Sequence, residues 1–156
     1  MEYLVVSDTH GRIERVVKYA LGQNFAGVIH AGDYYRDGIA LGAELEIPVY
    51  AVHGNCDGVW DGIEEEVFEL EGVKIFLAHG HFYHVKHDFK LIVQKALEQK
   101  AELIIFGHSH VPIYTKINGI WLLNPGSPSR PREGKDGSIA VLKIGEKSFT
   151  AEIIYL

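Results

Sequence analysis

The sequence has 156 residues, of which 47% are hydrophobic, so we expect one domain over residues 1–156 with a buried core. A formal net charge of -6 at pH 7 argues against nonspecific binding to membranes, and no stable nucleic-acid complex is expected. With one cysteine no intramolecular disulfide can form, and no apolar run approaches the ~18 residues that span a bilayer. Because the chain starts directly with a strand-like segment, we expect a cytoplasmic location.

The first half of the chain alternates between strand and helix patterns. Short apolar runs predict strands at residues 3–6, 27–30 and 49–52. Between them, residues 13–21 carry apolar side chains at helical spacing, and residues 38–45 repeat the pattern more weakly. This alternation predicts parallel strands joined by right-handed crossovers.

The second half is richer in strands. Residues 67–70 and 73–77 flank Glu71-Gly72 and predict a hairpin, and residues 89–97 predict a helix capped by Asp88. Further strands are expected at 103–106, 113–116, 120–123, 138–144 and 149–155. We therefore predict a layered α/β/β/α sandwich with mixed sheets, helices on the outer faces and an antiparallel, strand-rich C-terminal portion.

Polar side chains follow five of the predicted strands. The segments are Ser7-Asp8-Thr9-His10, Gly32-Asp33, Gly54-Asn55, His79-Gly80-His81 and Gly107-His108-Ser109-His110. Because open α/β sheets bind ligands at the carboxyl ends of their strands, these segments are expected to meet at one rim. Carboxylate, imidazole and amide donors suit Mn, Fe, Zn, Ni or Co. Seven donors exceed one tetrahedral zinc site and suit two ions that share a bridging carboxylate.

This ordered set of motifs resembles the calcineurin-like metallophosphoesterase superfamily. The short length, Gly54-Asn55-Cys56-Asp57 and Asn124-Pro125-Gly126-Ser127 look like the small YfcE-type phosphodiesterases of bacteria and archaea. The resemblance implies two divalent ions, with Mn expected first, and a hydroxide that attacks a small or nucleotide-like phosphodiester. It also makes a homo-oligomer, a dimer or a tetramer, a reasonable expectation. The implied metal ligands are Asp8, His10, Asp33 and His110 for one ion, and Asp33, Asn55, His79 and His108 for the other, with Asp33 bridging.

One position departs from the superfamily pattern. Many members carry histidine after the Gly-Asn pair, where this chain has Cys56. A thiol with a reference pKa of about 8.5 is a poor substitute as an acid, so good leaving groups or slow turnover are expected. Asn55, Cys56 and His81 are the candidate catalytic residues, although a small buried role is favoured for Cys56 and packing is as plausible for His81. The general acid stays unassigned.

Several other residues have two interpretations. We expect His30 to be a hydrogen-bonded interior histidine and His53 to have a structural role. Arg130 and Arg132 could reach a substrate phosphate, but a solvated loop is the favoured interpretation. Two alternative functions remain: a phosphomonoesterase or nucleotide pyrophosphatase, and a scaffold resembling the retromer subunit Vps29 with a degraded metal site. The seven competent donors argue against the scaffold.

Overall fold

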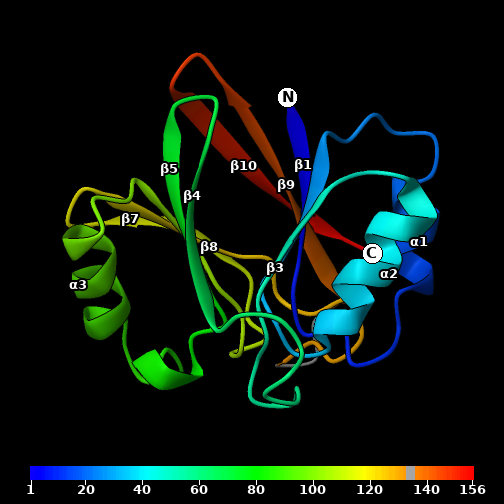
Figure 1. Ribbon diagram of the computed structural model, residues 1–156, viewed down its shortest axis with the longest axis horizontal. Helices are drawn as coiled ribbons and strands as arrows, with labels where there is room; N and C mark the ends of the chain where they lie inside the picture. The colour runs from blue at the N-terminus through cyan, green and yellow to red at the C-terminus, as the bar shows by residue number, and fades with distance from the viewer. Residues whose placement is uncertain (133–135) are drawn as a thin grey trace.

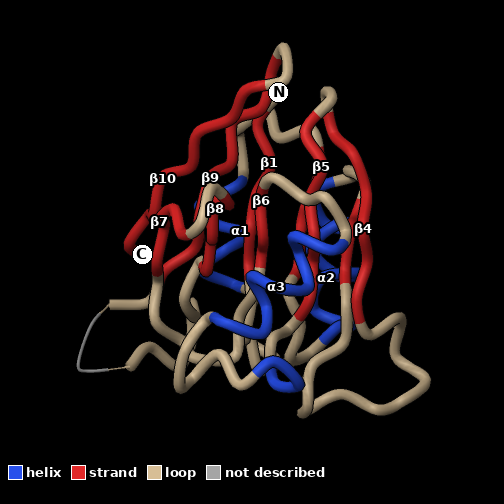
Figure 2. The backbone as a smooth tube through the Cα atoms, turned by 90° about the vertical axis from the view of Figure 1, so that its left-hand side faces the viewer, coloured by secondary structure: helices blue, strands red, loops and turns tan. Residues whose placement is uncertain are grey.

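Two five-stranded sheets pack face to face in the computed structural model, which describes residues 1–132 and 136–156 (Figures 1 and 2). The strand orders are β10-β9-β1-β2-β3 and β4-β5-β6-β8-β7. Helices cover the outer face of each sheet, which gives four layers and confirms the predicted mixed α/β sandwich. Among the described residues, no helix is both long and apolar enough to cross a membrane.

The first sheet holds the N-terminal strands. β1 (Glu2–Val6), β2 (Gly27–His30) and β3 (Val49–Ala51) are parallel, as the strand–helix alternation predicted. The C-terminal hairpin of β9 (Ser138–Gly145) and β10 (Ser148–Tyr155) adds to β1 in antiparallel orientation. The helices α1 (Glu14–Ala20) and α2 (Tyr35–Leu45) cover the outer face.

The second sheet is built around parallel β5 (Val73–Ala78), β6 (Leu103–Ile105) and β8 (Ile120–Asn124). Antiparallel β4 (Glu65–Leu70) and β7 (Ile113–Ile117) form its two edges. The helix α3 (Lys90–Glu98) covers its outer face, and a 3-10 turn, η1 (His81–Tyr83), precedes it. Asp88 accepts a 2.9 Å hydrogen bond from the Lys90 N–H, although Phe89 occupies the N-cap position.

The central strands β1, β2, β5, β6 and β8 are largely buried on both sides, which explains their apolar runs. In β1, Tyr3 and Val5 pack against the second sheet, while Leu4 and Val6 pack under the helices. Because side chains alternate across a strand, both sets must be apolar. In these central strands, the buried polar side chains lie at or just beyond the carboxyl ends, as His30 and Asn124 do.

The helix α2 begins at Tyr35, three residues before the predicted start at Gly38. The carboxylate of Asp57 accepts hydrogen bonds of 3.0 Å and 2.9 Å from the N–H groups of Tyr34 and Tyr35. These bonds satisfy amides that a helix start leaves unpaired. Since Asp57 lies in the turn after β3, no residue next to the helix predicts this start.

Candidate metal centre

Asp8 and Asp33 lie at the ends of neighbouring parallel strands, β1 and β2, and are 0% and 3% exposed. Asp8 Oδ2 accepts hydrogen bonds from Ser7 Oγ (2.7 Å) and the His108 N–H (3.0 Å). Asp33 Oδ1 accepts one of 2.9 Å from the Cys56 N–H. Asp8 Oδ1 is buried and has no hydrogen-bond partner among the described residues. A buried carboxylate oxygen in this state is suited to a cation.

Four donor groups converge around that oxygen. The ligand atoms of Asp8, His10, Asp33 and His110 all lie within 4.8 Å of one another. His110 Nε2 is 3.1 Å from Asp8 Oδ1, and His10 Nε2 is 3.4 Å from His110 Nε2. His10 Nε2 is also 3.9 Å from Asp33 Oδ2. These four residues are the set that the resemblance implies for one ion.

The remaining predicted ligands gather on the other side of Asp33. His79 Nε2 lies 3.3 Å from Asp33 Oδ1 and 3.1 Å from Asn55 Oδ1. The ring of His108 meets that of His79 edge-on, with 5.1 Å between centroids. Asp33 therefore lies between the two groups of donors.

Two backbone carbonyls orient the imidazoles. Nδ1 of His79 donates to the Ala31 carbonyl oxygen at 2.7 Å, and Nδ1 of His110 donates to that of Arg130 at 2.6 Å. A carbonyl can only accept, so each Nδ1 carries a proton, and in the neutral form of either ring Nε2 presents its lone pair toward the carboxylates. Lone pairs and carboxylate oxygens at such distances repel without a positive charge between them. The donor set therefore fits a divalent metal.

The ionisation of these groups agrees with this fit. Burial lowers the pKa of His79, but its hydrogen bond to Asp33 and the charge of Asp8 outweigh that effect and raise it. Burial raises the pKa of Asp33, yet its contacts with His79 and the Cys56 N–H hold it well below its usual range. A bound cation would offset the same two carboxylates.

The backbone is strained at most of these positions. Asp8, His10, Asp33, His108 and His110 have φ angles of +55°, +49°, +53°, +67° and +59°. Such angles are uncommon for residues with a side chain and cost roughly 1–3 kcal/mol each. Strained residues of this kind cluster at functional sites, and here they turn five polar side chains inward where apolar strands end.

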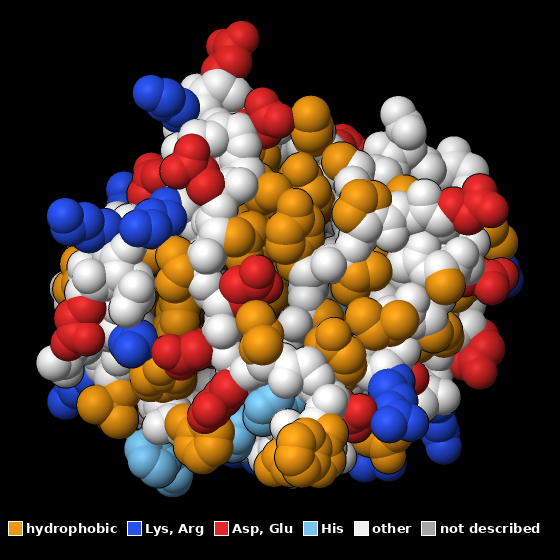
Figure 3. All heavy atoms as spheres, in the orientation of Figure 1, with side chains coloured by type: hydrophobic (Ala, Val, Ile, Leu, Met, Phe, Trp, Pro, Cys, Tyr) orange, Lys and Arg blue, Asp and Glu red, His pale blue; other side chains and the backbone are white. Residues whose placement is uncertain are grey.

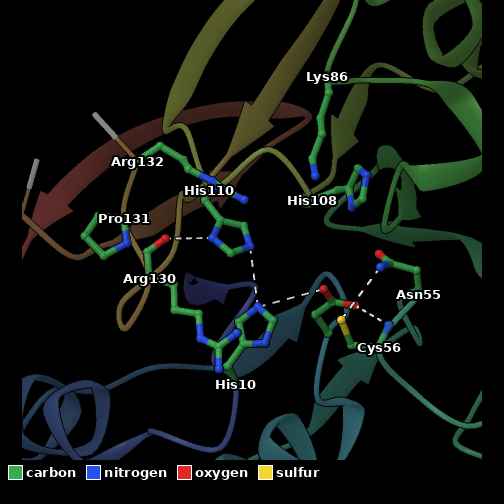
Figure 4. A pocket seen from close by; sticks show the side chains of 10 residues that line it. His10, Asn55, Cys56, Lys86, His108, His110, Arg130, Pro131 and Arg132 are labelled. Carbon is green, nitrogen blue, oxygen red and sulfur yellow. Dashed lines mark hydrogen bonds and ion pairs between the residues drawn. The ribbon is translucent and has the colours of Figure 1, made fainter. Parts of the chain in front are cut away.

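A cavity of about 370 Å³ opens over the donors (Figure 4). Histidine side chains are visible at the lower edge of the molecule in Figure 3, where the loops that follow the strands meet. The residues that line the cavity are His10, Asp33, Asn55, Cys56, Lys86, His108, His110, Arg130, Pro131 and Arg132. Asn55 and Cys56 therefore reach the cavity, as catalytic candidates must.

The expectation that Cys56 is buried is wrong. Its thiol is exposed, because the turn from Gly54 to Asp57 projects to the cavity mouth and is closed by a 2.8 Å hydrogen bond from the Gly54 N–H to Asp57. Partial burial, followed by its contact with Asp33, raises the pKa of Cys56 to about 11. The group is therefore a thiol at neutral pH.

His81 and His30 lie near the donors but have different surroundings. His81 does not line the cavity but packs beside the donors, 5.4 Å from the ring of His79 and 6.1 Å from that of His108. His30 is a buried, hydrogen-bonded residue, as expected: Nδ1 accepts from the Gly32 N–H (3.2 Å) and Nε2 lies 3.0 Å from Thr9 Oγ1. It supports the loops that carry Asp33 and His10.

Lys86 was not singled out from the sequence, because it lies in a polar loop seven residues beyond His79 without a motif of its own. Arg130 and Arg132 were expected in a solvated loop; they are exposed, but they also line the cavity. Only the packing of loops that are distant in sequence reveals this set of cations.

The sequence model of the Calcineurin-like phosphoesterase superfamily domain matches residues 1–147. A probable metallophosphoesterase of Methanothermobacter thermautotrophicus is 36% identical over 158 residues, covering 96% of this chain and 90% of that protein. Phosphodiesterase YfcE of Escherichia coli is 26% identical over 187 residues, covering 98% of this chain and 97% of that protein.

Solved structures share the fold. A conserved protein of Streptococcus pneumoniae, described as a predicted phosphoesterase, superposes with a TM-score of 0.82 at 30% identity, covering 99% of this chain and 88% of that one. Vps29 of Entamoeba histolytica in complex with Zn superposes with a TM-score of 0.80 at 21% identity, covering 99% of both chains, and shows the fold alone. On its family match and these relatives, the chain belongs to the calcineurin-like phosphoesterase superfamily.

Proposed function

We propose that the chain is a metal-dependent phosphodiesterase that hydrolyses small or nucleotide-like diesters. The observation that carries this proposal is the convergence of Asp8, His10, Asp33 and His110 within 4.8 Å, beside a second donor group of Asn55, His79 and His108. When bound, two divalent ions would lower the pKa of a water and withdraw charge from the phosphoryl oxygens. Mn is the first choice, and Ni, Fe, Zn and Co suit the same donors.

The residues of the chain have distinct roles in this proposal. Asp33 contacts both donor groups and would bridge the ions, while the carbonyls of Ala31 and Arg130 keep His79 and His110 in the ligating tautomer. Burial, then the charges of His79 and Lys86, lowers the pKa of His108 to about 4, so this ring is a neutral donor at pH 7. Neutral imidazole is the form that binds a metal.

Substrate preference follows from the groups at the cavity mouth. A thiol with a pKa of about 11 at Cys56 is a weaker acid than the histidine that many relatives are expected to carry there. Esters whose leaving groups need little protonation are therefore the best substrates. This supports diesters with acidic leaving groups and disfavours monoesters of alcohols.

The test is a metal-by-substrate matrix on protein stripped with a chelator. Bis(p-nitrophenyl) phosphate turnover should be absent without metal and return with Mn, at a higher rate than turnover of p-nitrophenyl phosphate. Asp33→Asn should lose its bound metal. Its activity should fall by more than the ~10–100-fold that loss of an outer-shell partner causes. Asp88→Asn, at an exposed residue beside α3, is the matched control and should behave like the wild type.

Turnover that persists after metal removal, or full activity in Asp33→Asn, would contradict the proposal. A faster reaction with the monoester would instead favour a phosphomonoesterase. Because Vps29 of Entamoeba histolytica is described in complex with Zn, metal binding alone does not separate an enzyme from a scaffold. Metal-dependent turnover does.

A further inference from the structure

Three cations line the metal cavity and come from two segments far apart in sequence. Lys86 lies in the loop between η1 and α3, whereas Arg130 and Arg132 follow β8. In Figure 4, Lys86 and Arg132 extend toward the cavity from opposite sides, and Arg130 lies alongside His10. The cavity thus combines a metal-donor floor with a basic wall.

This concentration of positive charge contrasts with the rest of the chain. The protein carries a formal net charge of -6, yet Asp33 is the only acidic side chain among the described residues that line the cavity. Within the described part of the chain, the ion pairs of lysine and arginine are Arg36–Asp61, Lys95–Glu65 and Lys143–Glu2, and none involves the three cavity cations. Their charges face the cavity without a described carboxylate to offset them.

A simple phosphodiester does not require these charges. Two divalent ions would bring four positive charges, which Asp8, Asp33, a hydroxide and the single negative charge of a diester would balance. Among the described residues, the three further cations then have no balancing charge in the cavity. A phosphate monoester carries about -1.5 to -2 charges at pH 7 and would balance most of their charge. Guanidinium groups are especially suited to bind a phosphate monoester, because they can donate two parallel hydrogen bonds to one phosphate.

We propose that Lys86, Arg130 and Arg132 form a second anion site, which selects phosphodiesters that carry an additional phosphate monoester on one substituent. This inference rests on the proposed phosphodiesterase function and names its substrate class. The cavity volume of about 370 Å³ lies near the lower end of the ~300–1,000 Å³ typical of small-molecule sites, which suits a compact diester of this kind.

The test compares two substrates that differ only in the additional phosphate. Thymidine 5′-(p-nitrophenyl phosphate) and its 3′-phosphorylated form both release p-nitrophenolate from the same diester. With the Mn-loaded full chain, kcat/KM should be about tenfold or more higher for the phosphorylated form, mainly through KM. The preference should shrink as salt rises from about 0.01 M to about 1 M, because the screening length falls from about 30 Å to about 3 Å.

The double variant Lys86→Ala/Arg132→Ala should reduce this substrate ratio to within about threefold of one, since it removes two of the three charges. Arg130 is left in place because its side chain lies alongside the candidate metal ligand His10 (Figure 4). Arg15→Ala/Lys18→Ala on α1 removes the same charges from exposed positions outside the cavity and should keep the wild-type ratio. A ratio is independent of the active fraction of each preparation.

Calorimetry gives a second readout that needs no turnover. The Mn-loaded wild type should bind thymidine 3′,5′-bisphosphate about tenfold tighter than thymidine 5′-monophosphate, and the double variant should bind both alike. Equal kcat/KM for the two substrates in the wild type, or an equal loss for both in the double variant, would overturn the second anion site. If neither substrate is turned over, the proposed function fails. In that case the calorimetric preference for the bisphosphate over the monophosphate still tests the second anion site.

Discussion

Ser127 Oγ donates a 2.7 Å hydrogen bond to the carbonyl oxygen of Asp8, and so joins the turn after β8 to the turn after β1, 119 residues away. The same hydroxyl accepts a 2.9 Å bond from the Arg130 N–H, and the Arg130 carbonyl orients His110. One buried serine therefore connects two candidate ligands of the same ion. The Asn-Pro-Gly-Ser segment thus acts as a support for the metal donors.

Ser127→Ala should lower the free energy of unfolding by about 1–3 kcal/mol, because it removes a hydrogen-bond partner of the buried Asp8 carbonyl and of the partly buried Arg130 N–H. It should also weaken Mn binding by ~10–100-fold, as loss of an outer-shell partner does. Urea unfolding and metal titration measure the two effects. Ser148→Ala removes an exposed serine bond to the Gly145 carbonyl and should stay within about 0.5 kcal/mol of the wild type. Equal effects of the two substitutions would rule out the supporting role of Ser127.

Gly54→Ala should abolish metal binding, because a methyl group at this position has no room. A Cβ would collide with the Asp33 carboxylate and backbone and lie 2.8 Å from Cδ2 of His79. Displacing either side chain by even a few tenths of an ångström loosens both donor groups. Activity should fall by at least ~100-fold, measured with bis(p-nitrophenyl) phosphate and saturating Mn. Gly145→Ala meets nothing within 4 Å and is the control. Normal metal content in Gly54→Ala would mean that the donors tolerate the shift.

Stability of the metal-free chain should decrease as the pH falls from about 6.5 toward 4. Burial lowers the pKa of His30 from 6.5 to about 4, so between these values the unfolded chain binds a proton that the folded chain does not. The unfolded state is favoured there, by up to about 3 kcal/mol from this residue. Urea unfolding at pH 5 and pH 7.5 in the presence of a chelator measures the slope.

His30→Asn removes the titrating group but keeps an acceptor for the Gly32 N–H, so its stability should depend less on pH than that of the wild type. His84→Asn, at an exposed histidine, should leave the slope unchanged. If His30→Asn retains the full wild-type slope, burial of His30 is not the source of the acid sensitivity.

Cys56→His should raise the rate for diesters with poor leaving groups. An imidazole with a pKa near 6.5 can donate a proton that a thiol with a pKa of about 11 holds too tightly. An alkyl p-nitrophenyl diester releases an acidic phenol and should gain little, whereas a dialkyl diester should gain ~10-fold or more. Product analysis with both substrates measures the difference, and Cys56→Ser, which offers no better acid, is the control. An equal gain for both diesters would show that histidine acts here by binding phosphate.

The arrangement of strands was predictable because it depends on local patterns. Runs such as Tyr3–Val6 are apolar on both faces, which is required only of a strand that is buried on both sides. Glu71-Gly72 marks the turn of the β4–β5 hairpin. The start of α2 was missed, since Asp57 satisfies its first amides from another loop. The burial of Cys56 was also misjudged, because the direction of a turn depends on what it packs against.

The sequence by itself determined that polar donors follow five apolar strands, and therefore that Asp8 and Asp33, which follow neighbouring parallel strands, would meet at one rim. The physical reason is that parallel strands end together, so residues at their carboxyl ends are brought close whatever their separation in the chain. Only the tertiary structure decided which atoms face one another: the tautomers of His79 and His110, and the meeting of Lys86 with Arg132. Those relationships depend on loops packing across the gap between two sheets, which no local pattern encodes.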